Sequence, residues 1–225
     1  MYHSVGDSGN GEVGAELYRV SVENFRKQME YVATRKEDSP ILTFDDGLAD
    51  NYTHAWPILK AKGIKAYFFI IVSKIGLPGY MNWGQIKELK DAGMTIGSHG
   101  MTHKILSGLL DLDYELRISK KNLEDELKCP IDFFSIPRGY CNKTVIHFTK
   151  DAGYKSAFTS NPNDNDGFVM GRIAVKGCWG LDYFVKVLNN GLSLKDKTEE
   201  CIKNASKKIL GIRNYDRLRS RILEK

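Results

Sequence analysis

Two pairs of side chains with metal-binding chemistry stand at two points of the chain, Asp45 with Asp46 and His99 with His103. Adjacent carboxylates repel each other, and burying them at the end of a strand is tolerable only where a positive charge lies beside them. If His99 and His103 share one helical turn, their imidazoles face the same way and can bind one ion. One aspartate and two histidines make a three-ligand site with open positions for water or substrate, which is typical of catalytic metal sites. The remaining aspartate would accept a proton from a bound water, so the pattern predicts metal-assisted hydrolysis.

Each group also has an ordinary structural interpretation. Asp45, Asp46 and Gly47 form a sequence common in turns, and a loop histidine often caps a helix or binds a carbonyl group. A third polar cluster runs from Ser135 to Tyr140, and a plain turn explains it as well as a functional loop does. A shared site is favoured because each of the three clusters follows a different predicted strand.

The chain alternates between strand-like and helix-like segments. Apolar runs predict strands over residues 41–44, 64–72, 94–97, 131–136, 154–159 and 172–175. Apolar residues at helical spacing predict helices over residues 21–35, 55–62, 83–92, 113–127, 143–152 and 181–188. Strand followed by helix, repeated, implies parallel strands with helices packed outside them. A (β/α) barrel and an open doubly wound sheet both fit, and in either fold ligands bind at the carboxyl ends of the strands, where the polar clusters stand.

Composition limits the class of protein. The chain has 225 residues, 42% of them apolar and 27% charged, which suffices for one well-buried domain with room for an extension. The net charge of +5 comes from residues 195–225, which hold 10 basic and 5 acidic side chains, whereas residues 1–194 hold 23 of each. The body of the domain therefore lacks the basic surface that binds nucleic acid, and we expect no nucleic-acid partner.

The extension has a pattern of its own. Apolar residues recur at three- and four-residue steps from Ile202 to Ile222 and are surrounded by lysine and arginine, which predicts a basic amphipathic helix. Such a helix packs on the domain or makes a peripheral contact with an anionic membrane. The sequence shows no secretory signal and no apolar stretch of about 20 residues, and its four cysteines are widely spaced. We therefore expect a cytoplasmic protein; oligomeric state is not indicated.

The same clusters carry a resemblance to a known family. Residues 43–47, Thr-Phe-Asp-Asp-Gly, match the first motif of the polysaccharide deacetylases, the NodB-homology domain of carbohydrate esterase family 4. Residues 98–103 resemble the second motif, with Gly100 where serine or threonine is usual, and residues 133–139 occupy the place of the third. The resemblance covers about residues 40–190. It implies an α/β fold, a distorted (β/α) barrel of the NodB-homology type with parallel strands and outer helices, spanning residues 1–190, with residues 191–225 as the amphipathic helical extension.

The resemblance also assigns roles. Asp45 takes the position of the catalytic base, and Asp46, His99 and His103 take the positions of the metal ligands. One divalent ion is expected, zinc first, although two histidines and an aspartate also suit cobalt, nickel and iron(II). The implied activity is hydrolytic removal of N-acetyl groups from an amino-sugar-containing polysaccharide or a lipid-linked saccharide.

Further residues are candidates for contacts with the carbohydrate substrate or with the oxyanion. They are Pro137, Arg138, Gly139 and Tyr140 in the third-motif loop, with the Tyr140 backbone N–H as a candidate oxyanion donor, and the side chains of Trp83 and His3.

Three departures from the family pattern keep two other functions open. The third-motif arginine that orients the base is replaced by Ser135, the fourth motif has no clear match, and no histidine follows His147 to supply the catalytic acid of the fifth motif. Residues 171–175 instead resemble a variant branch of the family, as does the Tyr-His pair at residues 2–3. The alternatives are a carbohydrate-binding protein with a weakened site and an amidohydrolase acting on a small cyclic amide.

Overall fold

The computed structural model describes residues 1–7, 15–35, 38–199, 202 and 205. Its main sheet has six parallel strands that neighbour one another in chain order. These strands are β3 (Leu42–Phe44), β4 (Ala66–Ile70), β5 (Thr95–Ser98), β6 (Phe133–Ser135), β7 (Ser156–Thr159) and β8 (Val169–Gly171). An open doubly wound sheet reverses its strand order at a switch point, so this unbroken order identifies the curled sheet of a distorted (β/α) barrel.

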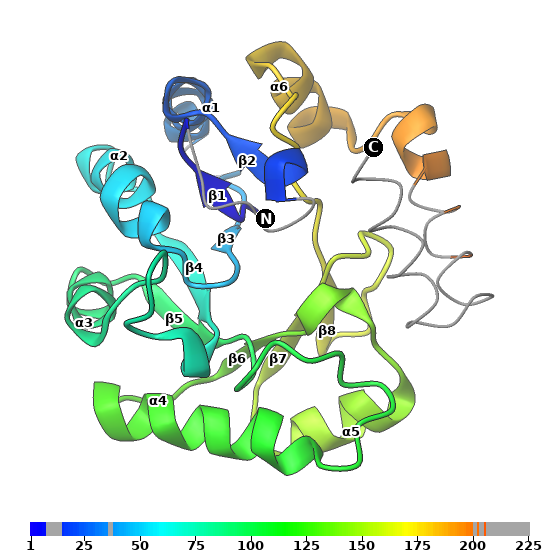
Figure 1. The fold of residues 1–225 in the computed structure, drawn as a ribbon. Helices are drawn as coiled ribbons and strands as arrows, with labels where there is room; N and C mark the ends of the chain where they lie inside the picture. Colours follow the sequence, from blue (N-terminus) through cyan, green and yellow to red (C-terminus); the bar gives the residue numbers. More distant parts are fainter. Residues whose placement is uncertain (8–14, 36–37, 200–201, 203–204, 206–225) are drawn as a thin grey trace.

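The helices α1 to α6 lie outside the curled sheet, as Figure 1 shows. They are α1 (Val22–Thr34), α2 (Trp56–Ala61), α3 (Trp83–Asp91), α4 (Ser119–Leu127), α5 (Lys143–Asp151) and α6 (Leu181–Asn190). Single turns of wider π-helix, η2 (Asn51–Ala55) and η4 (Tyr114–Ile118), lead directly into α2 and α4. Short 3₁₀ turns are η1 (Ala15–Tyr18), η3 (Val72–Lys74) and η5 (Pro137–Gly139). Across the described part of the chain, every helix is too short or too polar to cross a bilayer.

Local sequence explains where several helices begin. The Ser21 side chain accepts a hydrogen bond from the Asn24 backbone N–H at the start of α1. Asn82 and Gln85 cap α3 reciprocally, each side chain accepting from the other residue's backbone N–H. Such caps satisfy N–H groups that have no partner within the helix. Each of the helices α1 to α6 contributes buried apolar residues to the hydrophobic core.

The N-terminal segment closes the barrel. On one side the Tyr2 backbone N–H donates to the Thr43 carbonyl at 2.7 Å, beside β3. On the other side the Val175 N–H donates to the Met1 carbonyl at 2.9 Å. The segment continues into β1 (Ser4–Val5), which pairs with β2 (Arg19–Val20). Residues from the two ends of the domain therefore lie side by side at the centre of the fold, next to β3 (Figure 1).

The structure differs from the sequence prediction at the last strand and leaves the C-terminal extension largely undescribed. The last strand was expected over residues 172–175, but β8 ends at Gly171; the expectation was wrong because Val175 bonds to the N-terminal segment instead of to β7. The basic amphipathic helix over residues 195–225 lies largely outside the described residues, so its membrane contact stays a prediction, as does the domain boundary near residue 190. The α6 helix does end there, with Gly191 at a φ of 74°.

Candidate metal centre and active site

The polar clusters follow three strands of the curled sheet. Asp45 and Asp46 come directly after β3, His99 comes directly after β5, and Ser135 is the last residue of β6. Since the strands are parallel, their carboxyl ends meet at one rim of the barrel. The prediction that these clusters share a site is consistent with this placement, and the side-chain distances show how they meet.

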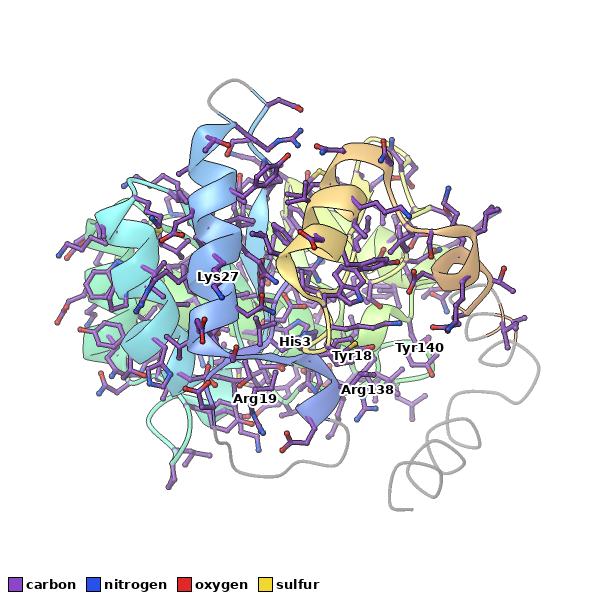
Figure 2. The ribbon with its side chains drawn as sticks, turned by 90° about the horizontal axis from the view of Figure 1, so that it is seen from above. His3, Tyr18, Arg19, Lys27, Arg138 and Tyr140 are labelled. Atoms are coloured by element: carbon purple, nitrogen blue, oxygen red, sulfur yellow. The ribbon has the colours of Figure 1, made fainter. Side chains whose placement is uncertain are left out.

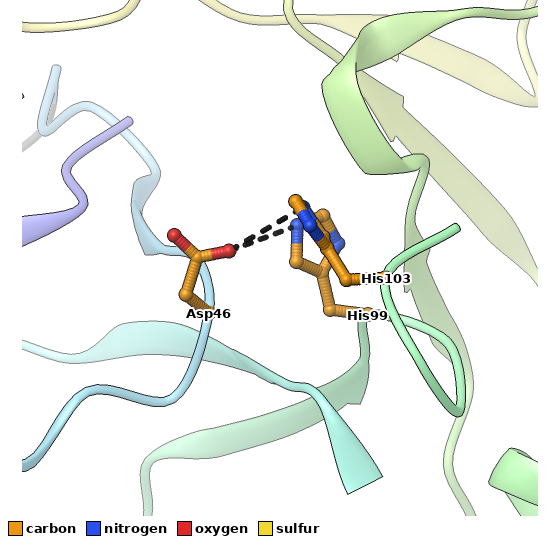
Figure 3. Close-up of side chains that lie close together, drawn as sticks. All are labelled: Asp46, His99 and His103. Atoms are coloured by element: carbon orange, nitrogen blue, oxygen red, sulfur yellow. Dashed lines mark ion pairs between the residues drawn. The ribbon is translucent and has the colours of Figure 1, made fainter. Parts of the chain in front are cut away.

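Asp46, His99 and His103 converge on one point (Figure 3). The Asp46 Oδ1 atom lies 3.4 Å from His99 Nε2 and 3.6 Å from His103 Nε2, and all three atoms lie within 4.8 Å of one another. Ligands about 2.1 Å from a tetrahedral zinc ion lie roughly 3.4 Å apart, so these separations suit such an ion. Asp46 Oδ1 is also buried and has no hydrogen-bond partner among the described residues. An orphaned buried oxygen facing two imidazole nitrogens fits a cation ligand.

The backbone at this site is strained. Non-glycine residues with positive φ are uncommon, and the described part of the chain has four of them. Three lie at the candidate site: Asp46 at 76°, His103 at 61° and Arg138 at 57°. Strained backbone persists only where the surrounding structure holds it, and it gathers at functional sites.

The histidine pair reaches its geometry differently from the sequence expectation. Residues 99–103 form an irregular loop after β5, not a helical turn, and Gly100 within it has a φ of 84°. The two rings still come together, with their centroids 4.8 Å apart. The two histidines therefore come together through an irregular loop, and not through the helical turn that their spacing suggested.

The Ser135 backbone determines the tautomer of His99. The backbone carbonyl of Ser135 lies 2.7 Å from His99 Nδ1. Because a carbonyl oxygen only accepts, Nδ1 carries the proton and Nε2 is left with the lone pair that a metal ligand needs. Two effects of opposite sign act on the pKa of His99. Burial lowers it, but the carboxylates of Asp45 and Asp46 outweigh burial and raise the pKa above its usual value.

Asp45 is held by a buried arginine that sequence reasoning did not identify. The Arg172 guanidinium donates to both carboxylate oxygens of Asp45, from Nη1 at 2.7 Å and from Nη2 at 2.8 Å. The Ser135 hydroxyl accepts from Arg172 Nη2 at 2.7 Å and donates to Asp45 Oδ2 at 3.0 Å. Arg172 thus supplies the guanidinium that the family places at position 135, and the small Ser135 side chain joins it to the carboxylate.

The surroundings of Arg172 explain how a guanidinium is tolerated where only 8% of the residue is exposed. Its remaining N–H groups reach the Thr43 hydroxyl at 3.1 Å and the Thr159 carbonyl at 3.3 Å. Its charge also lies over the faces of the Phe69 and Phe158 rings. Burial alone would raise the pKa of Asp45, but Arg172 and His99 outweigh burial and lower that pKa to about 2. Asp45 is therefore an ionised, oriented carboxylate beside the three candidate ligands.

His3 faces the same group from the N-terminal segment. Burial lowers its pKa, partly offset by Asp46 and Asp45, and its Nδ1 is buried with no hydrogen-bond partner among the described residues. The His3 carbonyl accepts from the Asn51 side chain at 2.7 Å, which ties the segment to η2. In Figure 2, His3 is seen on the side of the molecule where Arg138 and Tyr140 also appear.

The other predicted residues fall in two places. Pro137, Arg138 and Gly139 form η5, one residue after the end of β6, and the buried Tyr140 follows them. Arg138 is near enough to His103 to lower its pKa, although burial is the larger cause of a shift to about 4. Trp83 opens α3 and packs, partly buried, on the hydrophobic core, so its contact with a sugar stays a prediction.

One feature of the sequence around Arg172 could have indicated a buried charge. It stands between Gly171 and Ile173 in a segment that was otherwise suited to a buried strand, and a charged residue in such a segment needs a partner. The sequence does not say which partner, because Asp45 lies 127 residues earlier.

Comparisons with known proteins point to one family. The family model described as polysaccharide deacetylase matches residues 33–157. YxkH of Bacillus subtilis (strain 168), assigned to the polysaccharide deacetylases, is 30% identical over 201 residues, which cover 78% of this chain and 70% of that protein. A peptidoglycan-N-acetylglucosamine deacetylase of Bacillus cereus is 32% identical over 122 residues, 53% of this chain and 55% of that protein.

Solved structures show the same fold. A polysaccharide deacetylase from Bacillus cereus superposes with a TM-score of 0.74 at 24% identity, covering 83% of this chain and 67% of that one. The Streptococcus pyogenes deacetylase PplD, solved in complex with acetate, gives a TM-score of 0.70 at 22% identity, covering 83% of this chain and 95% of that one. With the matched family model and the length of the sequence match to YxkH, these findings show that the chain belongs to the polysaccharide deacetylase family.

Proposed function

We propose that the chain is a metal-dependent hydrolase that removes N-acetyl groups from an amino-sugar-containing polysaccharide or a lipid-linked saccharide. The observation that carries this proposal is the placement of Asp45, ionised and oriented by Arg172, beside three converging ligand atoms. The family membership supports a carbohydrate substrate. The name of the Bacillus cereus relative, a peptidoglycan-N-acetylglucosamine deacetylase, supports an N-acetylated sugar.

Asp46, His99 and His103 would hold the ion, with zinc as the first candidate. When bound, a divalent ion of this kind acts as a Lewis acid that polarises the acetyl carbonyl and makes a nearby water more acidic. The Asp45 carboxylate accepts the proton of the attacking water, and its fixed orientation saves the entropy of finding that geometry. Arg172 and Ser135 keep the carboxylate in place while its charge changes.

The departing amine needs a proton, and we propose that His3 relays to it the proton that Asp45 takes from the attacking water. The His3 ring lies within electrostatic reach of both Asp45 and Asp46, and its Nδ1, which is buried and has no hydrogen-bond partner among the described residues, can accept that proton. His3 would thus take the place of the fifth-motif histidine, which this sequence lacks. The loop from Pro137 to Tyr140 remains the proposed contact for the sugar and for the oxyanion.

An assay of acetate release tests the proposal. Wild-type protein with Zn²⁺ or Co²⁺ should release acetate from N-acetylglucosamine oligomers. Asp45→Asn should lower kcat by about 10²- to 10⁴-fold, the usual contribution of a general base, while still binding Co²⁺. Asp46→Asn should lose both activity and tight Co²⁺ binding.

The same assay separates the alternatives. Binding of the oligomers by wild-type protein with no acetate released, at any metal concentration, would indicate a carbohydrate-binding protein. Hydrolysis of small cyclic amides, but not of the oligomers, would indicate the amidohydrolase. Equal rates for wild type and Asp45→Asn would contradict the assignment of the base.

A further inference from the structure

In the part of the chain that the structure describes, one buried charged side chain lies outside the catalytic group. Among the described residues, four buried side chains carry a formal or potential charge, and three of them, Asp45, His99 and Arg172, belong to the site. The fourth is Glu115, of which 1% is exposed. Within the described structure it forms no ion pair with lysine, arginine or histidine. A buried carboxylate without a cationic partner is costly, so hydrogen bonds must stabilise this one.

Those hydrogen bonds come from the loop that carries the histidine ligands. Among the described residues, both donors to the Glu115 side chain belong to Thr102: its backbone N–H donates to Oε2 at 2.9 Å, and its hydroxyl donates to Oε1. Thr102 immediately precedes His103 in the chain. The Glu115 carboxylate therefore binds the loop at Thr102, the residue next to the candidate ligand His103.

A second contact holds the other end of the loop from the same helix. Ser119 stands one turn after Glu115, and its hydroxyl lies 2.9 Å from the Ser98 hydroxyl. Ser98 Oγ in turn accepts from the Gly100 N–H at 3.1 Å. The η4 and α4 helices thus hold the loop on both sides of Met101. Gly100 itself leaves room for the carboxylate, since a Cβ there would lie 2.9 Å from Glu115 Oε2.

The loop needs this support because its backbone is strained. Gly100 has a φ of 84° and His103 a φ of 61°, and the latter is uncommon for a residue with a side chain. We propose that Glu115 is a positioning residue of the metal centre, which holds residues 99–103 in the conformation that brings His103 to Asp46 and His99. This inference rests on the proposed metal site and extends it to a carboxylate that touches neither metal nor substrate. It also gives a physical reason for a buried carboxylate that the chemistry does not use.

Metal affinity tests the inference without an activity assay. Glu115→Gln keeps the size of the side chain but replaces one accepting oxygen with an NH₂ group, so one of the two Thr102 donors loses its partner. Titration of the metal-free variant with Co²⁺, followed by the visible absorption of the bound ion, should show an affinity about 10- to 100-fold weaker than wild type. The absorption bands should change shape because His103 is held less firmly. Glu126→Gln is the matched control, an exposed glutamate on α4, and should bind Co²⁺ as wild type does.

Two substitutions at Thr102 keep the test decisive if Glu115→Gln does not fold. Thr102→Val removes the hydroxyl donor and should weaken Co²⁺ binding, whereas Thr102→Ser retains the hydroxyl and should bind close to wild type. Equal Co²⁺ affinity in wild type, a folded Glu115→Gln and Thr102→Val would overturn the inference. Failure of the wild-type protein to bind Co²⁺ would instead contradict the metal centre itself, and with it the proposed function.

Discussion

Asp45 and Asp46 are neighbours in the chain, yet different groups neutralise them. Asp45 forms a bidentate ion pair with Arg172 and a hydrogen bond with Ser135. Asp46 faces two imidazoles with an oxygen that has no hydrogen-bond partner among the described residues. The positive charge beside Asp45 is therefore the Arg172 side chain, whereas Asp46 is suited to bind a metal ion. This difference in environment separates the role of a base from that of a ligand.

The partner of Asp45 leads to a prediction at the scale of one residue. Arg172→Lys replaces the planar guanidinium with a single ammonium that cannot bind both carboxylate oxygens. We expect kcat to fall about 10- to 100-fold with little change in KM. The pKa of Asp45 should rise because its main neutralising partner is weakened, so the acid limb of the pH–rate profile should move to higher pH.

The control for this prediction is Arg117→Lys, since Arg117 is half-exposed and pairs with Asp113 on the surface. It should leave the profile unchanged. Co²⁺ affinity should be similar in all three proteins, because no contact between Arg172 and the three ligands is present in the described structure. An unshifted acid limb in Arg172→Lys would show that Asp45 is not the titrating base.

The residues of the site differ in how far the sequence could predict them. Asp45, Asp46, His99 and His103 each follow a strand with a recognisable apolar run, so their common location could be inferred from the order of the elements. Arg172 could not be assigned in this way. Its hydrogen bonds cross 127 residues of sequence to Asp45 and 37 to Ser135, and no local pattern encodes which segments meet across a barrel.

At the scale of elements, the helices and strands were predicted where the signals are local. Gly63, Gly93 and Gly153 follow α2, α3 and α5, and each has the positive φ of a helix C-terminus, which glycine adopts without strain. The predictions were wrong where contacts with distant parts of the chain determine the local conformation. The loop over residues 99–103 is shaped by Glu115 and Ser119 from another helix, and the end of β8 is set by the N-terminal segment.

A second prediction concerns Gly171, the last residue of β8. A Cβ at this position would lie 2.2 Å from the Asn161 carbonyl oxygen and 2.8 Å from that of Asp164, so the backbone must shift. Arg172 is the next residue and would move with it. Gly171→Ala should lower the free energy of unfolding by about 1–3 kcal/mol, the usual cost of overpacking, and should lower kcat as well.

Gly180→Ala serves as the comparison for this change. A Cβ there would have no neighbour within 4 Å, and the expected loss is about 0.5 kcal/mol from a poorer N-cap residue, with kcat unchanged. Urea unfolding and the acetate assay measure both quantities. Full activity in Gly171→Ala would mean that the backbone at β8 does not control the position of Arg172.

At the scale of the whole molecule, the site joins separate parts of the barrel. The candidate ligands come from the ends of β3 and β5, the candidate base is held from β6 and from the segment after β8, and His3 comes from the segment that closes the sheet. An ion bound by Asp46, His99 and His103 would therefore link β3 to β5. Since the unfolded chain does not hold these side chains together, binding should stabilise the folded state.

Metal-dependent stability is the corresponding prediction. At a free Zn²⁺ concentration about 100 times Kd, the free energy of unfolding should rise by about 2.7 kcal/mol relative to protein in EDTA. For a chain of this length that corresponds to a Tm increase of roughly 5–10 °C. Asp46→Asn should show little increase under the same conditions. A Tm that is the same in EDTA and in Zn²⁺, or that rises equally in Asp46→Asn, would argue against the three-ligand site.

The sequence separation between Asp45 and Arg172 has a consequence for synthesis of the protein. A ribosome adds about 5–20 residues per second, so the Asp45 codon is translated roughly 6–25 seconds before that of Arg172. A nascent chain that ends shortly after His103 already contains every candidate ligand but lacks the guanidinium that orients the base. The ion pair that orients Asp45 can therefore form only in the later part of translation, once residue 172 has been added.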